Sequence, residues 1–314
     1  MVFDIMAKVA VLFTVLAIGA AARKKGVLND QTTRTMANVV LTIALPFLYF
    51  HSLTTTFTKE LFFTVWALPV FAVFFVLLAY SISVFLSRFL DLDKESKATF
   101  VYLATFTNCG FLAIPIANVL YGSEGIVRVV FFNVGFNLLY WTLGVGTLKA
   151  ARRTQNSAIP RLPHTAILKN LLNGGTIGLL CGMAAGVASV KLPIFLLDAS
   201  NILGSATIPL ALLVVGSIMT GWNMNDIRRY RRSIALIALC RLVLIPSLAL
   251  IITGSLGLPP LSRAIIVLQS AMPSASTTPI FTTKFGGNSQ LASVGVFATT
   301  ALSVLTIPVF LSLL

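Results

Sequence analysis

The stretch Asn108-Cys-Gly-Phe-Leu-Ala-Ile-Pro115 interrupts an apolar run that extends from Ala98 to Tyr121. A second apolar run, from Ala264 to Phe285, is interrupted in the same way by Pro273-Ser-Ala-Ser-Thr-Thr-Pro279. The prolines that close the two interruptions are 164 positions apart in a chain of 314 residues. Each half of the chain therefore carries one broken apolar segment at a corresponding place, which indicates that the two halves share one architecture.

The amino-acid composition places this architecture in a lipid bilayer. Hydrophobic residues make up 57% of the chain and charged residues only 10%, whereas an average soluble protein has about 25% charged residues. The net charge is +14, but the basic residues form short clusters between apolar runs, and no aromatic-basic motif of a nucleic-acid-binding module is present. We therefore expect the bilayer, and no nucleic acid, as a partner.

The apolar runs predict an all-α membrane protein with ten membrane-spanning segments. A helix needs about 20 apolar residues to cross the hydrocarbon core. Lipid cannot satisfy backbone polar groups, so such segments are helices unless they alternate as barrel strands do, and these do not. The expected spans are 3–22, 35–53, 61–87, 98–120, 126–148, 171–190, 195–220, 233–254, 262–284 and 290–313. The fourth and ninth of these are the broken ones.

The basic residues predict the orientation of these spans, because loops rich in lysine and arginine stay in the cytoplasm. One alternate set of loops holds 17 of the 23 basic residues and the other set holds four. The first set contains Arg23, Lys24, Lys25, Arg34, Arg88, Lys94, Lys97, Lys149, Arg152, Arg153, Arg161, Lys169, Arg228, Arg229, Arg231, Arg232 and Lys284. We expect both termini outside and the 149–171 loop in the cytoplasm, in a plasma membrane (the inner membrane in a bacterium).

Two five-helix repeats account for this pattern. The first covers 1–149, a linker covers 150–170, and the second repeat covers 171–314. Pro46 and Pro209, in the second and seventh spans, are 163 positions apart, which is close to the spacing of the two interruptions. Since five is an odd number, the second repeat is expected to be inverted in the membrane relative to the first.

The two breaks predict a binding site for an anion. Unwinding at membrane depth exposes backbone N–H and C=O groups, which is tolerated where they line a polar cavity. Half-helix N-termini carry partial positive charge and free N–H donors, so crossed breaks favour a carboxylate. The candidate side chains for this site lie in and around the two breaks and on the fifth span. They are Asn108, Gly110, Phe111, Pro115, Asn133, Asn137, Gln269, Pro273, Ser274, Ser276, Thr277 and Pro279.

Other chemistry finds little support in the sequence. All nine acidic residues fall near predicted span ends, whereas a carboxylate-centred cation exchanger usually keeps an acid inside the membrane. The sequence shows no nucleophile–base set, metal-ligand spacing or nucleotide motif, so we expect neither an enzyme nor an ATP-driven pump. Arg241, inside the eighth span, has two interpretations, as a ligand of a substrate anion or as a partner of a helix end.

The broken segments resemble those of the auxin efflux carrier family. Asn108 to Pro115 followed by Tyr121-Gly122, and Leu268 to Pro279 followed by Leu291-Ala-Ser-Val-Gly295, are similar to the broken fourth and ninth helices of that family. The resemblance implies ten helices in two inverted repeats, with broken helices 4 and 9 crossing as in sodium/proton antiporters and bile-acid transporters. It also implies that helices 1, 2, 6 and 7 form a scaffold, often a homodimer, and that helices 3–5 and 8–10 form an elevator-like transport domain.

The resemblance includes bacterial carriers of malonate and other small carboxylates. We therefore expect a secondary active or facilitative carrier of a small organic anion, malonate or an auxin-like acid among them. No cofactor is expected, and the coupling ion, H⁺ or Na⁺, is left open. Two alternatives are a sodium- or proton-coupled symporter of the bile-acid-transporter type and a membrane sensor that does not transport.

Overall fold

The computed structural model of the chain describes residues 2–152, 172–188 and 192–314. The predicted linker 150–170 lies outside the described residues from position 153 onward. Within the described residues the secondary structure is helical, and the one β-type pairing is an isolated antiparallel bridge between Thr107 and Ser274. The all-α class predicted from composition is therefore confirmed.

Helices cover each of the ten predicted ranges. Those of the first half are α1 (Val2–Lys24), α2 (Asp30–Val39), α3 (Leu45–Thr56), α4 (Lys59–Val65), α5 (Leu68–Ser87), α6 (Lys94–Thr105), α7 (Ala113–Leu139) and α8 (Val145–Ala151). Those of the second half are α10 (Gly174–Val187), α11 (Ile194–Ser205), α12 (Thr207–Ile218), α13 (Met224–Arg229), α14 (Arg231–Leu239), α15 (Ile245–Gly254), α16 (Pro260–Ala271), α17 (Thr278–Phe285) and α18 (Ser289–Ser312). Three short π-helical segments join neighbours without a break: η1 (Val40–Ala44), η2 (Tyr140–Gly144) and η3 (Cys240–Leu244).

Seven helical runs within the described residues are long and apolar enough to cross a membrane. They are Asp4–Lys24, Asp30–Thr56, Lys59–Ser87, Ala113–Ala151, Ile194–Ile218, Arg231–Gly254 and Ser289–Ser312. The fourth run has 39 residues and consists of two helices joined by a kink at Gly122, where φ is 60° and ψ is −150°, a conformation that glycine adopts without strain. The chain is thus a multi-pass membrane protein by length and composition of its helices.

The larger part of each predicted interruption is non-helical, and each break lies where local chemistry ends a helix. α16 ends at Ala271, two residues before Pro273, and α17 begins at Thr278 with Pro279 in its second position. Pro115 is the third residue of α7, where its missing N–H is one that a helix leaves unpaired in any case. The prolines therefore mark the starts of the second half-helices and do not themselves lie unwound, apart from Pro273. The first break covers residues 106–112 and the second covers 272–277.

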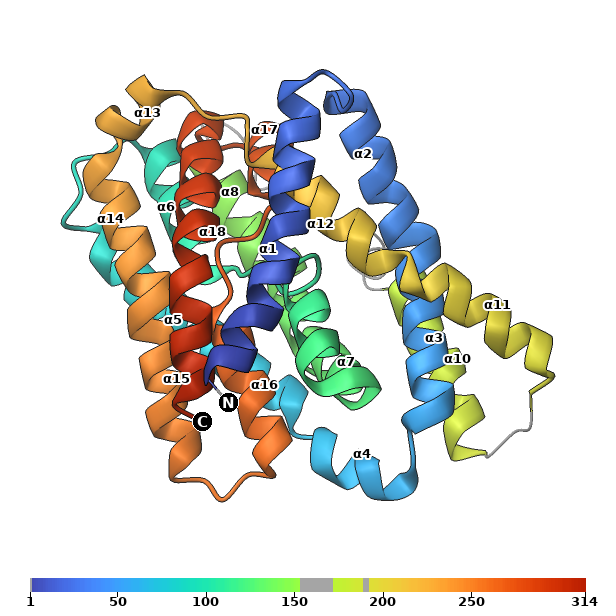
Figure 1. The fold of residues 1–314 in the computed structure, drawn as a ribbon. Coiled ribbons are helices and arrows are strands. Elements are labelled where there is room, and N and C mark those ends of the chain that lie inside the picture. The colour runs from blue at the N-terminus through green and yellow to red at the C-terminus, as the bar shows by residue number, and fades with distance from the viewer. Residues whose placement is uncertain (1, 153–171, 189–191) are drawn as a thin grey trace.

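The helices pack as two groups (Figure 1). α3 packs along α10 and α11, and α1 packs along α12, whereas α5, α6, α15, α16 and α18 form the other group with α7 and α8. The free ends of α1 and α18 lie at the same end of the molecule, opposite α13 and the α1–α2 turn. The two breaks lie inside the second group, near the middle of the molecule.

A row of glycines brings α10 into backbone contact with α3. Gly174, Gly178, Gly182 and Gly186 are each four residues apart and so share one face of α10. A methyl group added at Gly178 would overlap the carbonyl of Pro46, and at Gly182 and Gly186 it would lie 2.8 Å from carbonyl oxygens of α3. Small residues at this spacing permit the close helix approach that drives association in lipid.

Candidate functional site

The two breaks pair with each other through their backbones. The Asn108 N–H donates to the Pro273 carbonyl at 2.8 Å, and the Ala275 N–H donates to the Phe106 carbonyl at 2.9 Å. These two bonds form the antiparallel bridge between Thr107 and Ser274. Thr107 and Ser274, 167 positions apart in the sequence, therefore meet in an isolated bridge between four half-helices.

A cavity of about 940 Å³ opens beside this pairing. Its walls come from both breaks, from α7 and η2, from α5, and across the gap from η1, α3 and the start of α10. The volume is within the range of small-molecule sites, roughly 300–1,000 Å³. None of the described residues that line it is acidic, lysine, arginine or histidine. Its polar character therefore comes from amides, hydroxyls and backbone groups.

Asn108 and Thr107 are polar residues of the first break that line this cavity, and Asn108 carries an amide. Asn108 is 3% exposed, and its Nδ2 amide has no hydrogen-bond partner. A buried donor without a partner is unfavourable by about 1–3 kcal/mol. A hydrogen-bond acceptor bound at the Asn108 amide would remove that cost. Within the described residues, the backbone N–H groups of Cys109, Gly110 and Phe111 also lack an acceptor.

The second break adds donors of the same kind. Ser276 and Thr277 line the cavity, and their backbone N–H groups have no acceptor within the described residues. The Thr277 hydroxyl lies 2.6 Å from the Tyr140 hydroxyl, which η2 turns toward the break. The free N–H groups come from the unwound segments, because the first N–H groups of α7 and α17 already donate to carbonyls of the breaks: Ala113 to Asn108, and Thr278 to Ala275.

An amide relay connects the breaks behind the cavity wall. The Gln269 Nε2 amide donates to Asn133 Oδ1 at 3.1 Å, and the Asn133 Nδ2 amide donates to the Cys109 carbonyl at 3.2 Å. Asn137 lies one turn beyond Asn133 on α7 and lines the cavity. The relay fixes Asn133 in orientation and holds the first break against α16.

The structure brings seven of the twelve predicted site residues to the cavity. These are Asn108, Gly110, Phe111, Asn133, Asn137, Ser276 and Thr277. The other five do not line the cavity. They are Pro115, Gln269, Pro273, Ser274 and Pro279. Ser274, for example, is fully buried and its hydroxyl donates to the Leu103 carbonyl of α6 at 2.8 Å.

Of the aromatic residues of the cavity, sequence reasoning found Phe111 and missed the others. Tyr49, Phe136, Tyr140, Trp141 and Phe281 line it, and the ring centroids of Tyr140 and Phe281 are 5.1 Å apart. Aromatic residues are common on every membrane helix, so their type alone does not single them out. The π-helical segments η1 and η2 each supply cavity residues, and such segments are frequent at functional sites, but the sequence shows no pattern from which they could have been located.

Comparison with known proteins identifies the family. A family described as "membrane transport protein" matches residues 4–311, which is nearly the whole chain. The chain belongs to this membrane transport protein family. It is the family of the auxin efflux carriers, so the resemblance inferred from the broken segments is confirmed.

Two archaeal members of the membrane transport protein family are similar to this chain along almost their whole length. An uncharacterized transporter of Methanothermobacter thermautotrophicus is 27% identical over 305 residues, covering 96% of this chain and 95% of its own. An uncharacterized transporter of Methanocaldococcus jannaschii is 24% identical over 304 residues, covering 95% of each chain. Both names describe transporters, and neither specifies a substrate.

Proposed function

We propose that this member of the membrane transport protein family is a secondary active or facilitative carrier of a small organic anion, bound at the crossed breaks. The observation that carries the proposal is Asn108. Its buried amide nitrogen has no partner, the residue lies in the wall of a large cavity, and residues of both breaks with unpaired backbone N–H groups line the same cavity. Hydrogen bonds from such donors to an ionised group are the strong ones, so a carboxylate is the group that satisfies them best.

The charge of the site favours a monoanion. The described lining residues carry no charged side chain, so the attraction for an anion comes from N–H dipoles and helix N-termini, each of which is equivalent to about half a charge. A second carboxylate, as in malonate, would have to lie against the aromatic wall without a cation. We therefore place acids with one carboxylate and an apolar body above malonate in the expected order of substrates.

The aromatic wall supplies the surface for that body. Tyr49 on α3, Tyr140 and Trp141 of η2, and Phe281 of α17 all line the cavity. Rings of this kind bury large apolar area and pack edge-to-face or offset against a flat ligand. An acid whose carboxylate meets Asn108 would place its body among these rings.

The transport cycle that fits this arrangement is an elevator. In this proposal the chain crosses the bilayer ten times as two inverted repeats, 1–149 and 171–314. The fourth and ninth predicted spans, 98–120 and 262–284, form the crossover. The first, second, sixth and seventh predicted spans (3–22, 35–53, 171–190 and 195–220) are the scaffold, which also carries the homodimer contact. The other spans move. Support comes from the two packing groups and from the cavity between them, since α3 and α10 form one wall and the breaks the other.

The proposed orientation has both termini outside and the basic loops in the cytoplasm of a plasma membrane. Support comes from the position of both chain ends on one side of the molecule, with Arg23 and the arginine-rich α13 at the other (Figure 1). An even number of crossings follows from that arrangement. Accessibility of single cysteines introduced at each end to an impermeant maleimide would test it.

The test of function is uptake into proteoliposomes of labelled acids: malonate, an aliphatic monocarboxylate and an indole carboxylate. Proton and sodium gradients are imposed separately and together, and Asn108→Ala is run as the matched control. We expect saturable uptake of a monocarboxylate that the control loses. Uptake that Asn108→Ala retains in full would refute the assigned site, and a panel that gives no uptake at all would favour the sensor alternative.

A further inference from the structure

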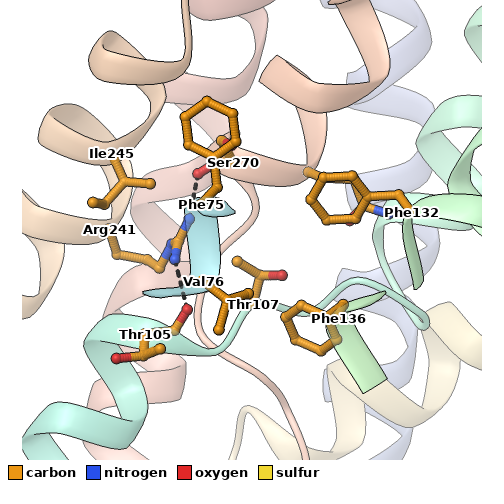
Figure 2. A pocket seen from close by; sticks show the side chains of 10 residues that line it. Phe75, Val76, Thr105, Thr107, Phe132, Phe136, Arg241, Ile245 and Ser270 are labelled. Carbon is orange, nitrogen blue, oxygen red and sulfur yellow. Dashed lines mark hydrogen bonds between the residues drawn. The ribbon is translucent and has the colours of Figure 1, made fainter. Parts of the chain in front are cut away.

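Arg241 lies in η3 and is the largest of the fully buried side chains, at 2% exposed. It does not line the 940 Å³ cavity, so of its two sequence interpretations the role as a substrate ligand has no geometric support. Its Nη1 donates to the Thr105 carbonyl at 3.0 Å, and its Nη2 donates to the Ser270 carbonyl. Figure 2 shows both bonds, with the guanidinium between the two broken segments.

Both acceptors lie at helix C-termini. Thr105 is the last residue of α6, and Ser270 is the next-to-last residue of α16. The last four carbonyls of a helix have no partner inside it, and a helix C-terminus is equivalent to about half a negative charge. The two half-helices together present about one negative charge, and a single guanidinium balances it.

Among the described residues, no carboxylate forms an ion pair with this arginine. The ion pairs among the described residues join Arg23 with Asp30 and Arg128 with Glu124, and neither involves Arg241. Its charge is therefore compensated by helix dipoles and not by an acid. Guanidinium stays charged in proteins, so the positive charge at this position is permanent.

We propose that the guanidinium of Arg241 takes the place of a coupling Na⁺ at the crossed breaks. It binds the Thr105 and Ser270 carbonyls that such an ion would need, and it thereby makes transport independent of Na⁺. In sodium-coupled carriers, unwound carbonyls and half-helix C-termini coordinate the ion. Here two such carbonyls are already bound by the guanidinium. The inference rests on the proposed carrier function and concerns its coupling.

The space beside Arg241 agrees with this assignment. The cavity there measures about 10 Å³ and is lined by Thr107, Gln269 and Ser270 among others (Figure 2). That is about the volume one water needs. Unpaired polar atoms point to it: Thr107 Oγ1, Gln269 Oε1, Ser270 Oγ and Arg241 Nε. A metal cation placed in it would sit next to a fixed positive charge, which is repulsive at low dielectric.

Arg241 is in this view a positioning residue. It ties α6 to α16 through their ends, so the two half-helices and the breaks that follow them keep one relative placement. Substrate binding at Asn108 depends on that placement, because Asn108 lies only three residues after Thr105. A neutral side chain at position 241 would leave the two C-termini uncompensated and free to separate.

The experiment measures uptake of the best acid from the panel in Na⁺ and in choline buffers of equal ionic strength. Wild type is compared with Arg241→Lys, Arg241→Gln and the control Arg128→Gln, which removes the other buried arginine away from the crossover. We expect wild-type uptake to be equal in the two buffers, a loss of at least about tenfold in Arg241→Gln, recovery of a large part of it in Arg241→Lys, and near wild-type uptake in Arg128→Gln. Wild-type uptake that requires Na⁺, or Arg241→Gln at wild-type rate, would overturn the inference while the carrier function stands.

Thermal unfolding of the detergent-purified protein gives a readout that does not need a known substrate. We expect the Tm of wild type to be the same in NaCl and in choline chloride, and that of Arg241→Lys likewise. A Tm that Na⁺ raises in wild type would show a bound cation and contradict the inference. If no acid is taken up, the carrier proposal fails, and this measurement still decides whether the crossover binds Na⁺.

Discussion

The two breaks look alike in sequence and differ in what their polar groups do. In the first, residues 106–112, Asn108 keeps an unpartnered amide, and three consecutive residues that line the cavity have N–H groups without an acceptor among the described residues. In the second, residues 272–277, the Ser274 hydroxyl and N–H are both used, to the Leu103 carbonyl and to Thr299 Oγ1. The first break keeps an unpartnered side-chain amide and three free N–H groups, and the second keeps free N–H groups at Ser276 and Thr277 but is anchored through Ser274. Symmetry of sequence therefore does not imply symmetry of function.

The largest effect is expected from Asn108→Asp. The change keeps the shape but removes both amide donors and adds a negative charge beside the bound carboxylate. Hydrogen bonds to charged groups are worth about 1.5–3 kcal/mol, so we expect affinity for the transported acid to fall by about 10- to 150-fold. Binding to the purified protein by isothermal calorimetry measures it, with Asn137→Asp as the control on the same cavity. Equal losses in the two variants would mean that the first break has no special role.

Ser274→Ala tests the anchored break. The variant removes one buried hydrogen bond to α6, for which we expect a loss of about 1–2 kcal/mol in stability and little change in substrate affinity. Thermal unfolding in detergent and the same calorimetric titration report the two quantities separately. A variant that melts normally but binds poorly would reverse the assignment of roles to the two breaks.

Tyr140→Phe probes the contact between the cavity wall and the second break. It deletes the hydroxyl that lies 2.6 Å from the Thr277 hydroxyl while it keeps the ring among its aromatic neighbours. A neutral hydrogen bond contributes about 1 kcal/mol, so we expect a several-fold change in the uptake KM. Thr277→Val should give a change of similar size, and the double variant should add little further, since both remove one bond.

The smallest effects are expected from Pro115→Ala and Pro279→Ala. Both prolines lie in the first turn of a helix, where an N–H has no intrahelical acceptor to reach. The unwound segments are held by the bridge between the breaks and by Arg241, so the helices should not become continuous. We expect uptake rates within about threefold of wild type. A severe loss in either variant would show that the proline itself maintains the break.

Much of this arrangement could be predicted from the sequence, and the limits have a physical cause. Composition and the interruptions at Gly110 and Pro273 are enough to predict helices, their breaks and a polar site at the breaks, because helix termination is local chemistry. Which donors remain free is not local. It depends on contacts such as Ser274 with Leu103, between segments 171 residues apart. Arg241 shows the same limit: the sequence left two roles, and only the Thr105 and Ser270 contacts decide between them.

The glycine row on α10 has a mechanical consequence. Where Gly178 and Gly182 meet α3, backbone rests on backbone with no side chains between them that could change rotamer under load. We therefore expect α3 and α10 to keep their relative position as a rigid pair, and this pair forms one face of the cavity. If the transport domain slides along this face during a cycle, the free energy that drives the step moves that domain and does not bend the α3–α10 pair.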